Sequence, residues 1–278
     1  MALVLALGSG LTWGIADFVG GLAAKRAAAT TVTLVSQAFG LVALLPLLPL
    51  LPGEPSVAAF TSGAVAGLAG CVGLLAYLRA LALGPMGVVA PLAAVVGVIV
   101  PVVAGLMTGE RVSTVAAAGI GLGLVAIVVV AAGDTRRPAQ RSAGLAGPLL
   151  ALAGGGSFGV FFVLLDFTPD GSGLWPLVGA RASSLTLMAV LVALTRGPWP
   201  ARRAVPMVAS SGILDMLANV LFLFATRAGL LTVSALLASL YPVVVVVLAR
   251  HVLSERLRRP QVLSVGLALV AIAAITVG

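Results

Sequence analysis

The chain has 278 residues, of which 61% are hydrophobic and 9% are charged, and its formal net charge is +8. A soluble domain typically carries about 25% charged residues, so this composition excludes a water-soluble globule and favours a chain that lies in a lipid bilayer. The excess of positive charge does not indicate a nucleic-acid partner, because the basic residues form short clusters between apolar runs, as in the loops of membrane proteins.

Ten apolar runs follow one another along the chain, each about 20 residues long and therefore long enough to cross the hydrocarbon core as a helix. The predicted spans are 3–24, 31–51, 58–82, 86–107, 114–132, 143–165, 174–195, 205–226, 230–250 and 260–277. No basic residue stands ahead of the first run, which we therefore interpret as a retained span rather than a cleaved signal peptide. The predicted fold class is an all-α membrane protein with ten transmembrane helices.

A polar link at 133–142 divides these spans into five plus five, and the two halves resemble each other. Residues 80–133 align with residues 225–278 at an offset of 145 without gaps, and 19 of the 54 positions are identical. We therefore predict two five-helix repeats, 1–141 and 142–278. Because five is an odd number, the second repeat crosses the membrane in the opposite sense, which gives an inverted repeat.

Positive charge predicts the orientation of the chain in the membrane. Twelve basic residues fall on one side of the predicted spans and only two, Arg111 and Arg227, on the other. The twelve are Lys25, Arg26, Arg136, Arg137, Arg141, Arg196, Arg202, Arg203, Arg250, Arg256, Arg258 and Arg259. Since positively charged loops stay in the cytoplasm, this bias places the basic side inside the cell and both termini outside.

Several short motifs resemble those of one known family. They are Trp13-Gly14, "YLRALALG" at 77–84, "SLYP" at 239–242 and "LSERL" at 253–257. Their order and spacing, over nearly the whole chain, are similar to those of the drug/metabolite transporter superfamily, EamA type. The resemblance implies ten helices, with the first four of each repeat around a central cavity and spans five and ten at the periphery. It also implies export or exchange of small metabolites, and cytoplasmic termini, which the distribution of positive charge does not favour.

Two aspartates stand inside predicted spans, Asp17 in the first and Asp215 in the eighth. An aspartate at the bilayer centre costs about 2.5–3.5 kcal/mol, so such residues persist where they face a wet cavity or an opposite charge. Arg79 and Arg181 are the candidate partners, and two acids with two arginines would carry no net charge. None of the four has a charged counterpart 145 residues away, which suits one oriented ligand. The alternatives are a structural ion pair and, for Arg79, a side chain that extends to the interface.

Other polar and aromatic residues accompany these acids. Asn219 follows Asp215 by four residues and shares its helix face. Trp13 precedes Asp17 by four, and an acid beside an indole suits an organic cation or an amino group through cation–π attraction, although Trp13 could equally be an ordinary packing residue. The predicted substrate or proton site comprises Asp17, Asp215, Asn219, Arg79, Arg181, Trp13, Tyr241 and Gln37.

Prolines predict bends in two spans of the predicted cavity wall. Pro91 and Pro101 stand in span four, and Pro242 stands in span nine. A proline inside a helix frees backbone groups, which are tolerated at membrane depth where they line a cavity. These prolines therefore support a pocket at spans four and nine.

These features lead to one hypothesis and several alternatives. We expect a secondary active transporter, an exporter of a small metabolite (an amino acid, an organic cation or a drug), that works by alternating access in a bacterial inner membrane, with protons as a candidate coupling ion. The alternatives are a facilitative or uptake transporter or exchanger, and an intramembrane enzyme with paired Asp17 and Asp215. One cysteine, one histidine and no HExxH motif lead us to predict neither an enzyme nor a metal or cofactor. Spans five and ten have almost no polar residues and predict a lipid-facing surface or a homodimer contact.

Overall fold

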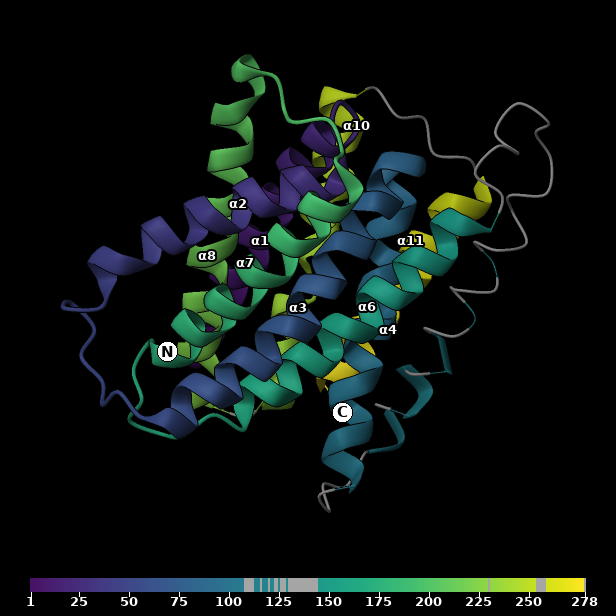
Figure 1. Ribbon diagram of the computed structural model, residues 1–278. Coiled ribbons are helices and arrows are strands. Elements are labelled where there is room, and N and C mark those ends of the chain that lie inside the picture. The colour runs from purple at the N-terminus through teal and green to yellow at the C-terminus, as the bar shows by residue number, and fades with distance from the viewer. Residues whose placement is uncertain are drawn as a thin grey trace.

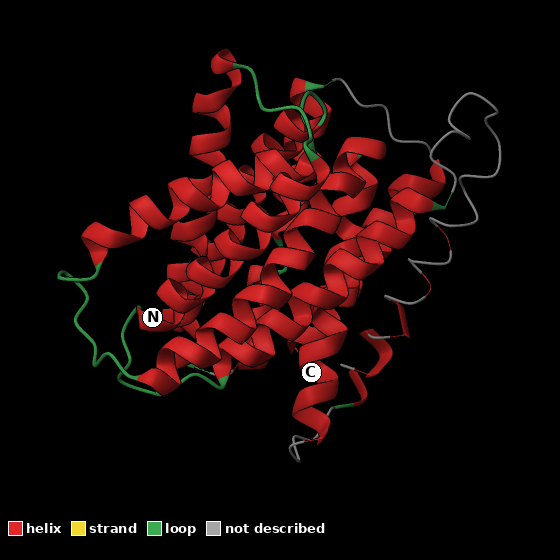
Figure 2. Ribbon diagram, in the orientation of Figure 1, coloured by secondary structure: helices red, strands yellow, loops and turns green. Residues whose placement is uncertain are grey.

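The computed structural model describes residues 1–107, 145–229, 231–253 and 259–277, together with a few residues between 113 and 129. Every regular element in these ranges is a helix, in agreement with the predicted all-α class (Figure 2). In chain order they are α1 (Ala2–Ala24), α2 (Ala29–Leu44), η1 (Leu45–Leu47), α3 (Val57–Leu83), α4 (Met86–Met107), α6 (Ala146–Asp166), α7 (Trp175–Thr195), η3 (Arg202–Ala204), α8 (Val205–Arg227), α9 (Leu231–Ala238), α10 (Tyr241–Val252) and α11 (Arg259–Val277). Figure 1 shows the long helices side by side in one bundle.

Six stretches of the described chain are helical, long and apolar enough to cross a membrane, and they mark the chain as an integral membrane protein. They are α1, α2 with η1, α3, α6, α7, and η3 with α8, which match predicted spans one, two, three, six, seven and eight. Spans four and ten coincide with α4 and α11, and span nine with α9 and α10. Apart from scattered positions, the predicted span 114–132 and the link 133–142 lie outside the described residues, so the number ten stays a prediction.

The two halves of the chain pack against each other in an equivalent way. α1 packs most extensively on α8, while α6, which is α1's counterpart at the offset of 145, packs on α3, the counterpart of α8. Likewise α1 contacts α9 and α10, and α6 contacts α4. All of the most extensive helix contacts join one half to the other, so the halves interlock rather than form separate lobes. A two-repeat membrane fold fits this packing.

Small residues permit the closest helix approaches. Gly10 of α1 faces the end of α9, where an added Cβ would lie 2.8 Å from the carbonyl oxygen of Ala238. Gly155 of α6 is equivalent to Gly10, and it faces Ala93 of α4, which is equivalent to Ala238. The same glycine-to-alanine contact therefore holds the same helix crossing in each half.

The predicted bend in the proline-containing spans becomes a break only in the second half. α9 ends at Ala238 and α10 begins at Tyr241, with Pro242 in its first turn, where the missing N–H leaves no hydrogen bond unmade. α4 runs unbroken through Pro91 and Pro101. The break brings Tyr241 to the wall of a pocket.

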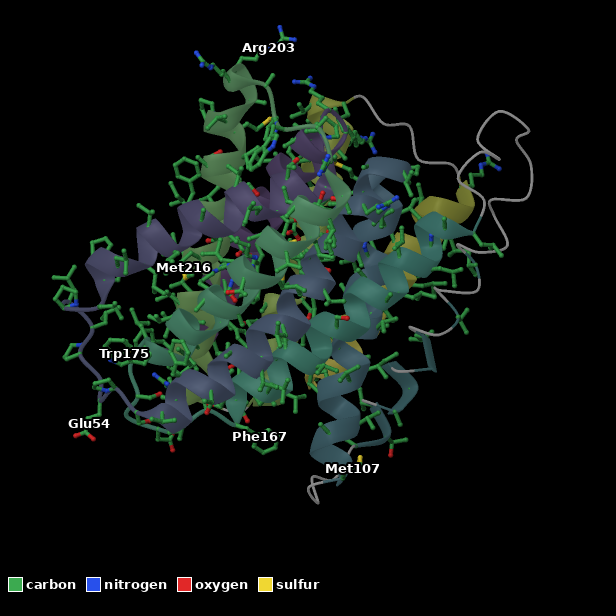
Figure 3. All side chains as sticks on the ribbon, in the orientation of Figure 1. Glu54, Met107, Phe167, Trp175, Arg203 and Met216 are labelled. Atoms are coloured by element: carbon green, nitrogen blue, oxygen red, sulfur yellow. The ribbon has the colours of Figure 1, made fainter. Side chains whose placement is uncertain are left out.

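Basic side chains gather at one end of the bundle, which we call the basic end. It is formed by the loop between α1 and α2 and the loop between α7 and α8. These loops carry Lys25, Arg26, Arg196, Arg202 and Arg203. Figure 3 shows Arg203 at this end, while Glu54, Phe167 and Trp175 lie at the other, which we call the opposite end. For the described residues this is the separation of charge that the sequence predicted.

The predicted dimer surface on spans five and ten is only partly described. α11 exposes Val262, Leu263 and Val270, and it contacts chiefly α4 and α9, at the periphery of the bundle. Most of span five lies outside the described residues. Because an exposed apolar face fits lipid as well as a second copy, the homodimer stays a prediction.

We predict that Gly155→Ala lowers the free energy of unfolding by about 1–3 kcal/mol, because the added methyl group would collide with the backbone of Ala93 and overpacking carries a penalty of this size. Gly266→Ala is the matched control, since a Cβ there meets no atom of the described residues within 4 Å. Thermal or denaturant unfolding of the detergent-solubilised protein measures both. Equal stability of the two variants would contradict the close approach of α4 and α6.

Candidate functional site

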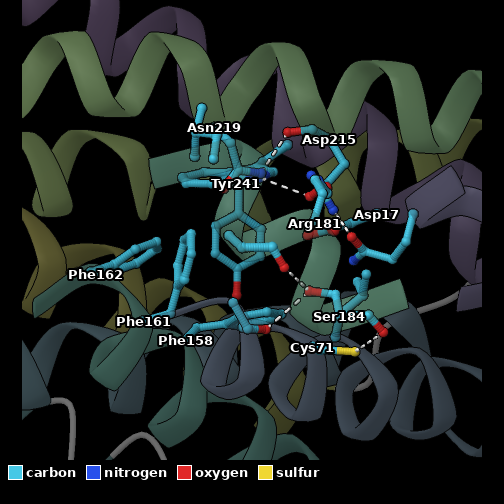
Figure 4. Close-up of a pocket in the computed structure, with 17 residues that line it drawn as sticks. Asp17, Cys71, Phe158, Phe161, Phe162, Arg181, Ser184, Asp215, Asn219 and Tyr241 are labelled. Atoms are coloured by element: carbon cyan, nitrogen blue, oxygen red, sulfur yellow. Dashed lines mark hydrogen bonds and ion pairs between the residues drawn. The ribbon is translucent and has the colours of Figure 1, made fainter. Parts of the chain in front are cut away.

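A pocket lies between the two halves of the chain (Figure 4). It includes about 650 Å³ of space free of protein atoms, counting the part that is open to solvent. Its lining comes from α1, α2 and α3 of the first half and from α6, α7, α8 and α10 of the second. Since both halves supply walls, any movement of one half against the other would change the pocket.

One guanidinium organises the polar side of this pocket. Arg181 Nη2 forms an ion pair with Asp215 Oδ2 at 2.5 Å, and Arg181 Nη1 donates a hydrogen bond to Gln37 Oε1. The other carboxylate oxygen of Asp215, Oδ1, accepts a hydrogen bond from Trp13 Nε1 at 3.2 Å. Asn219 Nδ2 donates to the backbone carbonyl of Asp215 at 2.7 Å. The network thus joins α1, α2, α7 and α8, and its buried charges are paired and hydrogen-bonded, as burial requires.

Asp17 is the second carboxylate in the lining, and no described cationic side chain forms an ion pair with it. It is only 8% exposed. The hydroxyl groups of Tyr77 and Tyr241 lie near this carboxylate. The buried Tyr77 hydroxyl makes no hydrogen bond of ordinary geometry to any described residue. The lining therefore holds two carboxylates and one guanidinium, and it carries one excess negative charge when both acids are ionised.

The other side of the pocket is aromatic. Phe158, Phe161 and Phe162 of α6 line it, and Figure 4 shows them away from the polar group around Arg181. The ring of Phe162 contacts that of Trp13 with 5.4 Å between their centroids. A pocket with an apolar wall and a few convergent polar groups is the ordinary form of a small-molecule site.

The repeat relates the polar wall to the apolar wall. Four lining residues of α1 and α8 have counterparts at the offset of 145 that also line the pocket: Trp13 with Phe158, Asp17 with Phe162, Asp215 with Gly70 and Asn219 with Leu74. The members from α1 and α8 supply both carboxylates of the pocket, whereas their counterparts in α6 and α3 are apolar. A symmetric scaffold therefore carries an asymmetric site, which can hold a ligand in one orientation.

Seven of the eight predicted site residues line this pocket: Asp17, Asp215, Asn219, Arg181, Trp13, Tyr241 and Gln37. Arg79 does not. It is exposed and lies one turn before the end of α3, where its long side chain can reach the membrane interface. The expected set of two acids and two arginines is corrected to two acids and one arginine.

Sequence reasoning missed some lining and supporting residues. Tyr77 stands in the sequence only as part of a family motif, but in the structure it packs edge-on against Tyr241, the other of the two tyrosines in the chain, with 6.2 Å between ring centroids. Cys71 also lines the pocket, and its Sγ donates a weak hydrogen bond to the Ser184 carbonyl at 3.7 Å. The repeat could have predicted Phe162. It lies 145 residues after Asp17, so the two residues occupy equivalent faces of equivalent helices.

The chain also contains one sequence pattern that is common in hydrolases. A G-x-S-x-G sequence at 155–159 lies inside the continuous helix α6, without the strand-to-helix turn that exposes a nucleophilic serine. Within the described ranges no group of three His, Cys, Asp or Glu side chains is arranged to hold a metal ion. The polar groups of the pocket are instead arranged to bind charge.

Comparisons with known proteins agree with this geometry. The sequence profile of the EamA-like transporter family matches residues 1–132 and again residues 145–277. A solved structure named only "Crystal structure of protein" is similar to this chain, with a TM-score of 0.68 and 19% sequence identity, over 99% of this chain and 97% of that chain. At this identity the likeness shows the fold alone. The search of curated proteins found no match.

Because the family profile covers nearly the whole chain in two halves, this protein belongs to the EamA-like transporter family, of the drug/metabolite transporter type. The family assignment and the apolar helices together define an integral membrane transporter.

We predict that Arg181→Gln destabilises the protein more than the double variant Arg181→Gln/Asp215→Asn does. Loss of the guanidinium alone leaves the largely buried Asp215 carboxylate with the Trp13 hydrogen bond but without a positive partner, at a cost of up to about 3–5 kcal/mol, whereas loss of both charges removes most of that penalty. Thermal unfolding of the wild type, the two single variants and the double variant completes a double-mutant cycle. Additive effects would contradict an energetic coupling between Arg181 and Asp215.

Proposed function

We propose that this chain is a secondary active transporter that exports a small, positively charged metabolite in exchange for protons. The observation that carries the proposal is the charge balance of the pocket, in which two carboxylates face one guanidinium. Arg181 is held by Asp215 and Gln37, so Asp17 is the carboxylate left for a ligand.

The physical cost of burying Asp17 supplies a coupling mechanism. An ionised aspartate at membrane depth is unfavourable by about 2.5–3.5 kcal/mol unless a positive charge accompanies it. A proton or a cationic substrate can neutralise this carboxylate. Because either one is sufficient, the binding of one disfavours the binding of the other. If the halves change their relative position only when Asp17 is neutralised, an inward flow of protons drives the substrate outward.

The two walls of the pocket support a substrate class. A positive group would lie toward Asp17 on the polar side, next to the face of Trp13, where cation–π attraction adds to the charge. An apolar body would lie toward Phe158, Phe161 and Phe162. An amino acid zwitterion fits less well than an amine, because its carboxylate would need a guanidinium that Asp215 already occupies. We therefore propose an amphipathic amine or quaternary ammonium compound.

The repeat supports transport by alternating access. Two copies of a five-helix unit in opposite orientations would present equivalent surfaces to the two sides of the membrane. The positive charge of the basic end supports a cytoplasmic position for that end, in the cell membrane of a bacterium. The rival hypothesis of an aspartate-pair enzyme is less favoured, because Asp215 is engaged by Arg181 and Trp13 rather than sharing a proton with Asp17.

We predict that Asp17→Asn abolishes proton-coupled transport and leaves the fold intact, because the amide cannot exchange a proton for a cation. The measurements are the uptake of radiolabelled probes by reconstituted vesicles and the internal pH, followed with a trapped pH-sensitive dye, because a one-for-one exchange of a proton for a monovalent cation moves no net charge. Phenethylamine and benzyltrimethylammonium serve as cationic probes, and phenylalanine as the zwitterion of similar shape. Asp17→Glu, which keeps the charge, is the matched variant and should keep both the uptake and the pH change.

Three other outcomes of the transport assay would contradict parts of the proposal. Equal proton-coupled uptake of the cations in the wild type and in Asp17→Asn would remove Asp17 from the coupling role. Saturable uptake that leaves the internal pH unchanged would favour the facilitative or uptake alternative. Transport of phenylalanine but of neither amine would contradict the proposed substrate class while leaving the transporter assignment in place.

A further inference from the structure

The loops of the basic end close the bundle through one backbone carbonyl. Pro198, between α7 and α8, accepts a hydrogen bond at its carbonyl from the Ala28 N–H, with 3.3 Å between nitrogen and oxygen. The same carbonyl accepts a second hydrogen bond from Thr31 Oγ1 at 2.8 Å. Ala28 and Thr31 belong to the loop after α1 and the first turn of α2, so this contact joins the first half of the chain to the second.

The loops of the opposite end make a corresponding contact. The carbonyl of Gly53, between α2 and α3, accepts a hydrogen bond from Trp175 Nε1 at 3.3 Å. The backbone of Gly173 touches that of Gly53, so closely that a Cβ on Gly173 would lie 2.8 Å from the Gly53 Cα. Gly173 has a φ of +53°, a conformation that favours glycine. The Glu54 N–H also donates to the carbonyl of Gly171 at 3.0 Å.

These two contacts are equivalent positions of the repeat. The offset of 145 carries Gly53 onto Pro198, so the accepting carbonyl is the same one at each end. It also carries Ala28 onto Gly173, so the residue that touches it is the same as well. The contacts lie at opposite ends of the bundle, where a pair of alternating closures has to lie.

One feature of the opposite end has no equivalent. Arg227, half-buried at the end of α8, donates from Nη1 to the Gly173 carbonyl at 2.7 Å and from Nη2 to Ser172 Oγ at 2.8 Å. The equivalent residue in the first half is Ala82, which has no side-chain donor. The guanidinium therefore holds the loop between α6 and α7 in the position that meets Gly53.

We propose that the Ala28–Pro198 and Gly173–Gly53 contacts are the two gates of the transporter, and that Arg227 is a positioning residue that favours closure of the gate at the opposite end. The proposal rests on the proposed transport function. In the absence of substrate the extra bonds from Arg227 bias the protein toward access from the basic end. A ligand that favours the reverse state must overcome this bias.

The chain offers its own probe for gate opening. Cys71 is its only cysteine and lines the pocket. A small, membrane-impermeant methanethiosulfonate reagent added to one side of proteoliposomes therefore modifies Cys71 only when the gate on that side opens. The orientation of the protein in each preparation follows from trypsin cleavage at Arg202 and Arg203, which are exposed at the basic end. Protein unfolded in detergent gives the rate of complete access.

We predict that Arg227→Gln raises the rate of Cys71 modification from the opposite end by about tenfold, the change expected when charge-assisted hydrogen bonds are lost from one of two states. Modification from the basic end should fall or stay constant. Arg202→Gln, which removes a charge from the other end, should leave both rates unchanged. The loss of Arg227 should not disturb the orientation of the chain in the membrane. It removes a positive charge from the opposite end and so increases the excess of positive charge at the basic end.

A second pair of variants tests the gate without changing charge. Gly173→Ala should raise modification from the opposite end, because its methyl group would collide with Gly53. Gly147→Ala, in the first turn of α6, is the control, since no described atom lies within 4 Å of the added Cβ and the residue takes no part in either contact. A rise in Gly173→Ala with none in Gly147→Ala supports the gate.

Three outcomes would overturn the proposal: unchanged modification in both Arg227→Gln and Gly173→Ala, an equal rise from both sides, or no modification of the folded protein from either side in any variant. None of these measurements requires a transported substrate. A failure of the gates is therefore distinguishable from a failure of the proposed substrate or proton coupling, which appears only in the vesicle uptake and internal-pH measurements.

Discussion

A buried carboxylate needs a positive partner, and this pocket supplies one guanidinium for two carboxylates. Arg181 pairs with Asp215, and Gln37 and Trp13 complete the hydrogen bonds of that pair. The pair is therefore satisfied within the protein, at a site where an isolated charge would be strongly unfavourable. No cationic side chain of the described residues pairs with Asp17, and we propose that Asp17 is the group through which the pocket responds to a proton or a cation.

The interlocked packing links the pocket to the relative position of the two halves of the chain. The pocket walls come from both halves of the chain, and the most extensive helix contacts also join the two halves. In the proposed mechanism, neutralising a carboxylate between the two halves changes the free energy of their relative position, because each half supplies part of the wall around it. Glycine-to-backbone approaches, such as Gly155 against Ala93, keep the helices close without large side chains that would interdigitate and resist sliding.

Symmetry and its exceptions divide the structural roles. Equivalent positions of the two halves build the helix crossings, the pocket faces and the proposed gates, and these are the parts that have to work in both directions. Two exceptions are Asp17 opposite Phe162 in the pocket and Arg227 opposite Ala82 at the ends. In the proposed mechanism they supply orientation, because the first pair distinguishes the head of a ligand from its body and the second distinguishes one side of the membrane from the other.

The sequence by itself determined the helical class, most of the helix positions, the duplication and the separation of basic from non-basic loops, because hydropathy, periodicity and charge are local properties. It also identified seven of the residues that line the pocket, since ionisable and polar groups are conspicuous in an apolar span. Only the tertiary structure decided that Arg181 pairs with Asp215, that Arg79 lies outside the pocket, and that span nine breaks while span four does not. Those outcomes depend on which helix faces meet across the bundle, and distances between helices are set by packing of the whole chain rather than by spacing along it.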